Sequence, residues 1–143
     1  MEDMEARVWQ RVLAQPQKTQ VEDLKPLILV AQELTAVYGR LVREMTGRSR
    51  ELLRRLQETE LANIACLKGI SALQGRGVRL NSIQVAREPA EKALEKCYHR
   101  TRRATTEYMA RSAGAEFGEV YRALADRERE QCVRLAEVLG NLI

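Results

Sequence analysis

Two glutamates, each followed one helical turn later by a side-chain amide, are the residues of this sequence best suited to chemistry. Glu60 precedes Asn63, and Glu128 precedes Gln131. Each pair interrupts an apolar stripe, and the two stripes share a 3-4-3-4-3 spacing: Leu53, Leu56, Glu60, Asn63, Leu67 and Ile70, then Tyr121, Leu124, Glu128, Gln131, Leu135 and Val138. Because this spacing follows one face of an α-helix, all four polar side chains are predicted to face the core.

A carboxylate in a core requires hydrogen-bond partners, and two carboxylates placed close together resist ionising at the same time. We therefore expect Glu60 and Glu128 to bond with neighbouring amides and phenols, and one or both to carry a proton. The expected partners are Asn63, Gln131, Tyr38 and Tyr108. The alternative is that these glutamates lie on the surface, where most helical glutamates are found.

The elements that must position these residues are all helical. A short amphipathic helix is expected over 4–14, with Val8, Trp9, Val12 and Leu13 on one side. Longer helices are expected over 21–46, 49–74, 88–113 and 116–140. Ser49 is a plausible N-cap, and Pro89 fits a first-turn position, where its missing N–H costs nothing.

The lengths of the connections predict how these helices are arranged. The short connections near Gly47 and Gly114 make two antiparallel hairpins, and residues 75–87 form a long connector without helical periodicity. The predicted fold is all-α, a four-helix bundle with one crossover. Residues 1–20 are then an amphipathic helix with its linker, and 21–143 are the bundle.

The composition favours a single soluble domain. The chain has 143 residues and a net charge of +4, and its one strongly apolar run, residues 26–31, is too short to span a bilayer. We expect a cytoplasmic protein without membrane contact. Cys66, Cys97 and Cys132 are expected to be reduced and buried, with a redox or metal role as the minor alternative. Interleaved acids and bases, without a base-reading motif, argue against nucleic-acid binding.

The pattern of inward residues resembles the rubrerythrin-like branch of the ferritin-like superfamily over roughly residues 21–140. The segments that carry the resemblance are VAQELTAVYGRL, LQETELANIACLKGI, TRRATTEYMARSA and YRALADREREQCVRLAEVLGNL. Active members of that branch have Glu-x-x-His on the second and fourth helices, and a glutamate about two turns before a tyrosine on the first and third. The resemblance therefore implies a bundle whose ancestors held two iron atoms.

Most of the implied ligand set is substituted in this chain. Glu60 and Glu128 match two of the glutamates, and Tyr38 and Tyr108 match the tyrosines. The remaining four ligand positions hold Ala31, Asn63, Thr101 and Gln131. Glu33 lies near the first gap, but two residues along a helix is a rotation of about 200°, so it should not replace the missing glutamate.

These substitutions favour a degenerate site without a cofactor, in a protein that works by association or as a structural or binding protein. Relatives in the branch commonly dimerise, so a homodimer is expected, and the 4–14 helix could pack on its own bundle or on a partner. The alternative function is an oxidase or peroxidase with an altered site, in which Glu60 and Glu128 bind iron or manganese.

Overall fold

The computed structural model describes residues 23–114 and 116–143 as four α-helices, and within these ranges the chain forms no strand. The helices are α2 (Lys25–Glu44), α3 (Gly47–Leu73), α4 (Ala90–Ser112) and α5 (Gly118–Leu142). The predicted all-α, four-helix architecture is confirmed for this part of the chain. The helix expected over 4–14 lies outside the described residues.

Local backbone chemistry places the helix ends a few residues from their predicted positions. The first long helix begins at Lys25 rather than near Val21, with Pro26 in its first turn. Ser49 is not an N-cap, because α3 already begins at Gly47. Gly47 has a φ of 64°, a left-handed conformation that glycine adopts without steric cost.

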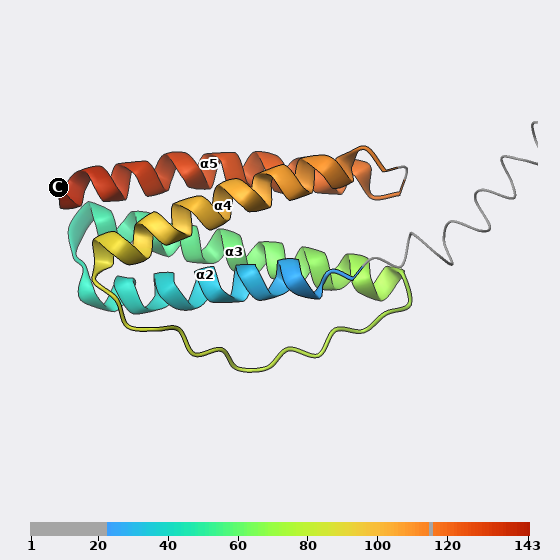
Figure 1. Cartoon of the computed structure of the whole chain (residues 1–143), viewed down its shortest axis with the longest axis horizontal. Coiled ribbons are helices and arrows are strands. Elements are labelled where there is room, and N and C mark those ends of the chain that lie inside the picture. Colours follow the sequence, from blue (N-terminus) through green and yellow to red (C-terminus); the bar gives the residue numbers. More distant parts are fainter. Residues whose placement is uncertain (1–22, 115) are drawn as a thin grey trace, which may run out of the picture.

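Neighbouring helices are antiparallel, and the bundle has a single long crossover (Figure 1). The hairpin of α2 and α3 packs against the hairpin of α4 and α5, through α2 on α4 and through α3 on α5. The chain between α3 and α4 runs the length of the bundle along the outside of α2. The predicted pair of hairpins with a crossover connector therefore describes the path of the chain.

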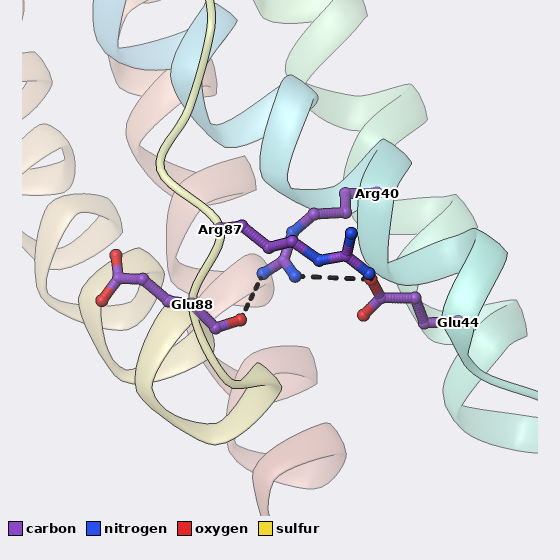
Figure 2. A network of polar contacts seen from close by, with 4 residues as sticks. All are labelled: Arg40, Glu44, Arg87 and Glu88. Carbon is purple, nitrogen blue, oxygen red and sulfur yellow. Dashed lines mark hydrogen bonds and ion pairs between the residues drawn. The ribbon is translucent and has the colours of Figure 1, made fainter.

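Polar contacts fasten this connector to α2. The Arg40 guanidinium donates to the main-chain carbonyl oxygen of Glu88 at 2.9 Å and pairs with Glu44 at 3.4 Å, and Arg87 pairs with Glu44 at 3.6 Å (Figure 2). Earlier in the connector, the carbonyl oxygen of Asn81 accepts a hydrogen bond from the Gln32 amide of α2 at 3.4 Å. Three polar contacts, at two positions along α2, thus hold the crossover in place.

The interior consists of two apolar clusters with polar side chains between them. The first cluster is Leu24, Leu27, Ile28, Ala31, Ile64, Leu67, Ile70, Ala104, Tyr108, Tyr121, Leu124 and Ala125. The second cluster is Leu34, Val37, Tyr38, Leu41, Leu52, Leu53, Leu56, Ala93, Leu94, Cys97, Leu135 and Val138. The buried polar residues that separate them, called the polar layer below, are Glu60, Asn63, Thr101, Glu128 and Gln131. None of the described helices is long and apolar enough to cross a membrane.

Candidate functional site

The polar layer brings the two predicted glutamate–amide pairs together at the seam between α3 and α5. The exposed fraction is 1% for Glu60 and 0% for Glu128, Asn63 and Gln131. The shared spacing of the two stripes puts each amide one turn beyond its glutamate, on the same buried face. Because α3 and α5 are antiparallel, the amide of each helix lies beside the glutamate of the other.

The amide groups donate across this seam to the carboxyl groups. Asn63 Nδ2 donates to Glu128 Oε1 at 2.8 Å and, at the weak limit of 3.5 Å, to Glu60 Oε1. Gln131 Nε2 donates to Glu60 Oε2 at 3.3 Å and to the main-chain carbonyl oxygen of Leu56 at 3.0 Å. The expected bonding between the amides and the carboxyl groups is thereby confirmed.

Two arginines fix which way the amides point, and sequence reasoning missed both. Arg127 Nη1 donates to Asn63 Oδ1 at 3.4 Å, and Arg134 Nη1 donates to Gln131 Oε1 at 2.8 Å. A guanidinium can only donate, so it selects the amide oxygen and leaves the amide N–H groups facing the carboxyl groups. The available signal was spacing, because Arg134 lies three residues after Gln131 and therefore on the same side of α5.

The two glutamates differ in how strongly they hold a proton. Burial raises the pKa of Glu128 well above its usual value, and both the charge of Glu60 and a hydrogen bond to Glu60 raise it further. Burial also raises the pKa of Glu60, but hydrogen bonds from Glu128, Gln131 and Asn63 counteract that rise. Burial thus raises the pKa of both carboxyl groups, and the rise is stronger at Glu128, which favours Glu128 as the member of the pair that keeps a proton. The second carboxyl oxygen of Glu128, Oε2, is buried and has no hydrogen-bond partner among the described residues.

Both tyrosines line the site, and Tyr38 does not bond as predicted. The Tyr38 hydroxyl is fully buried and finds no hydrogen-bond partner among the described residues, so the expected bond from Tyr38 to a glutamate is wrong. Burial, the nearby Cys97 and the two glutamates raise the pKa of Tyr38. Burial followed by the charges of Glu128 and Glu60 raises the pKa of Tyr108. Both phenols thus stay neutral beside the carboxyl pair.

The remaining substituted positions contribute no ligand. Ala31 is 2% exposed, and the Thr101 hydroxyl donates to the Cys97 carbonyl oxygen on its own helix at 2.8 Å. Glu33 pairs with Arg100 at 3.5 Å outside the polar layer, which agrees with the expectation that it does not replace a missing glutamate.

The donor set does not fit a di-iron centre. Two metals bridged in a bundle core take carboxylates from four helices and imidazoles from two. Here the seam offers carboxyl groups from α3 and α5 only, and the amide oxygens, through which amides ligate metals, are turned toward arginines. Within residues 23–114 and 116–143, no three acidic, cysteine or histidine side chains gather as metal ligands.

The cysteines are free, but burial is uneven among them. Cys97 is buried, and burial raises the pKa of its thiol to about 12. Cys66 and Cys132 are only half-buried, so the expectation that all three are buried is wrong for these two. Both lie at the edges of their helices' buried faces, where the sequence pattern gives no sharp boundary.

Comparison with known proteins adds no second line of evidence to this geometry. No protein-family model, curated protein or solved structure matches the chain.

Proposed function

We propose that this protein is a ferritin-like bundle of rubrerythrin type that has lost di-iron catalysis and works by association. The antiparallel neighbours and the single crossover support a ferritin-like topology. The matched register of Glu60 and Glu128 on α3 and α5 supports descent from a symmetric pair of ligand motifs. Because a fold does not confer an activity, the functional part of the proposal depends on the polar layer.

One observation carries the loss of catalysis: the amide N–H groups, not the amide oxygens, face the carboxyl pair. The 2.8 Å bond from Asn63 to Glu128 occupies a carboxyl oxygen that a metal would need. The 2.8 Å bond from Arg134 to Gln131 holds the second amide in the same sense. Hydrogen bonds from the two amides thus occupy carboxyl oxygens that metal ions would otherwise bind.

An apolar outer face on α3 supports association with another protein, first of all a second copy of the chain. Opposite its buried side, the second half of this helix exposes Leu61, Ala65, Gly69 and Ala72, with Lys68 among them. Leu61 is 51% exposed, and Leu73 beside this face is 76% exposed. Outer faces of bundle helices are ordinarily charged at several positions, so a face that carries Lys68 as its one charged residue fits a helix-to-helix contact. The free cysteines fit a reducing compartment, and we place the protein in the cytoplasm.

Light scattering coupled to size-exclusion chromatography tests the association. We expect a dimer for the unaltered chain and a shift toward monomer for Leu61→Glu, because a charge at the contact would have to be desolvated. Val133→Glu is the matched control, since Val133 is an apolar residue on α5 that is 71% exposed. An unaltered chain that remains monomeric at high micromolar concentration would contradict the homodimer.

A second candidate function is metal binding by Glu60 and Glu128, with iron or manganese as the metal. The observation that favours it is a pair of buried oxygens, Glu128 Oε2 and the Tyr38 hydroxyl, that no described residue bonds. Elemental analysis after purification without chelator, followed by a peroxide-turnover assay, separates the two candidates. Stoichiometric iron or manganese that disappears in Glu60→Gln, together with turnover, would establish the second candidate. Substoichiometric metal unaffected by that substitution supports the first.

A further inference from the structure

The crossover connector covers the seam between α2 and α4 along one half only. Over the second half of α2, the connector lies across this seam, and Val85 packs against the second apolar cluster. Over the first half of α2, the seam remains a groove of about 480 Å³ that none of the described connector residues lines. Glu33 and Arg100, which pair at 3.5 Å, line both this groove and the hollow under the connector. The groove therefore ends at this ion pair, where the connector begins.

The floor of the groove is apolar. Leu27 on α2 and Ala104 on α4 are buried there, and Val30 is half-buried. Pro26, in the first turn of α2, continues the apolar lining. Small-molecule sites in proteins are mostly apolar, carry a few polar groups and have volumes of about 300–1,000 Å³. The groove has the size of such a site, and its floor suits an aliphatic chain.

Five charged side chains line the groove, and four of them form two ion pairs. Besides the pair of Glu33 with Arg100, Arg111 pairs with Glu107 at 3.1 Å. The fifth is Arg103, which is exposed and forms no ion pair with any residue in the described part of the chain. The groove thus presents one uncompensated positive charge beside an apolar floor.

We propose that this groove binds a single-chain anionic amphiphile, with its aliphatic chain on Leu27 and Val30 and its carboxylate on Arg103. A guanidinium binds a carboxylate through two parallel N–H···O bonds, which fixes the head of the ligand. From Arg103 to Arg111 the groove follows α4 for about 12 Å. Because a C–C bond is about 1.5 Å long, an extended chain advances about 1.3 Å per carbon. A chain of about ten carbons therefore matches the floor.

Both parts of the ligand are needed for binding. A small anion without a chain would gain only an exposed ion pair with Arg103, which contributes little in water. An amphiphile with a cationic head would place its charge beside the same arginine and be repelled. The site is separate from the polar layer, which lies at the seam between α3 and α5.

Decanoate is the probe, and carbon-13 methyl NMR of the full-length protein locates where it binds. We expect saturable shifts of the methyl resonances of Leu27 and Val30, and none at Leu61 on the outer face of α3. Val30→Gln should weaken decanoate binding by about tenfold, because it removes apolar surface from the floor. Leu29→Gln should bind decanoate like the unaltered chain, since Leu29 is 44% exposed on the same helix and does not line the groove.

A pair of arginine substitutions keeps the test valid if Val30→Gln impairs folding. Arg103→Gln should weaken decanoate binding by about threefold to tenfold, as expected for an exposed charge pair. Arg102→Gln, which removes the same charge from a neighbouring hollow, should leave the affinity unchanged. Decyltrimethylammonium, a cation with the same chain length, should bind more weakly than decanoate to the unaltered chain.

Three results would overturn the proposal. The first is the lack of saturable decanoate binding at millimolar concentration. The second is equal affinity for decanoate and decyltrimethylammonium, which would show that Arg103 does not select the head group. The third is a decanoate-induced shift at Leu61 without shifts at Leu27 and Val30, which would place the chain on the outer face of α3.

Discussion

The apolar clusters and the polar layer are held together by different forces, although the same four helices build both. Each apolar cluster excludes water by packing aliphatic and aromatic side chains, a contribution proportional to buried area and indifferent to orientation. The polar layer depends on donors and acceptors that face each other, as in the 2.8 Å bond from Asn63 to Glu128. The clusters therefore supply stability, whereas the polar layer fixes how α3 and α5 must be aligned.

The polar layer is also asymmetric in a way that the clusters are not. Glu60 and Glu128 occupy matching positions, yet Glu60 accepts bonds from both amides and Glu128 accepts one. This difference teaches that two equivalent carboxyl groups can share a core when one gives up its charge. The four predictions below test this comparison between the clusters and the layer, and between the two halves of the layer.

The largest effect is expected in an apolar cluster. Leu94 is 0% exposed in the second cluster, so Leu94→Ala removes buried methyl groups and leaves a cavity. We expect the free energy of unfolding to fall by about 2–5 kcal/mol in urea denaturation. Ala136→Gly, at an exposed position of α5, is a control for a general loss of helix stability and should cost only about 1 kcal/mol. A smaller loss at Leu94 than at this control would refute the role given to the clusters.

The two glutamates should respond in opposite ways to the same substitution. In Glu128→Gln, the new oxygen can still accept from Asn63, and the new amide can donate to Glu60 as the acid proton does. In Glu60→Gln, an amide N–H faces the N–H groups of Gln131 or Asn63, leaving a donor unsatisfied. We therefore expect Glu60→Gln to lose about 1–3 kcal/mol of unfolding free energy and Glu128→Gln to lose none. Equal losses in urea denaturation would mean that the proton is not held mainly by Glu128.

The polar layer should also make stability depend on pH, whereas the clusters should not. The pKa of Glu128 is raised in the folded state, so folded protein binds more protons than unfolded protein once the pH exceeds the ordinary value of 4.5. Stability should then fall as the pH rises, with a slope of at most about 1.4 kcal/mol per pH unit for one proton. Urea denaturation between pH 5 and 8, where exposed carboxylates are already ionised, measures this slope. Glu128→Gln should flatten it, and Leu94→Ala should leave it unchanged.

The smallest effect concerns the hydroxyl of Tyr38. That hydroxyl is buried without a partner, so Tyr38→Phe should raise the free energy of unfolding, by about 1 kcal/mol. Thermal denaturation at pH 7 detects the change as a higher Tm. Loss of stability instead would show that the hydroxyl has a partner in solution, which is the result that metal or ligand binding near Tyr38 would give.

The sequence predicted which face of each helix is buried, but it did not predict how the side chains on that face are oriented. The 3-4 spacing correctly predicted every buried position of α3 and α5 in the two polar stripes, because helical period alone determines which face a residue occupies. Hydrogen-bond direction depends on rotamers and on residues from other stripes. Arg127 and the unpartnered hydroxyl of Tyr38 were missed for that reason. The predicted burial of Cys66 and Cys132 was wrong for a related reason, because both residues lie at the margin of the buried face.

The helix ends could not be predicted from periodicity either. Pro26 in the first turn and the left-handed backbone at Gly47 set where α2 and α3 begin, and both act through local geometry rather than pattern.

The protonation state of the two glutamates at neutral pH tests the central claim most directly. Carbon-13 NMR of glutamate side-chain carboxyl groups, on protein purified without chelator, reports each state separately. We predict one carboxyl resonance at the protonated position at pH 7, absent in Glu128→Gln and retained in Leu94→Ala. Two ionised glutamates at this centre, or resonances broadened there by a bound paramagnetic metal, would contradict a carboxyl pair that shares one proton.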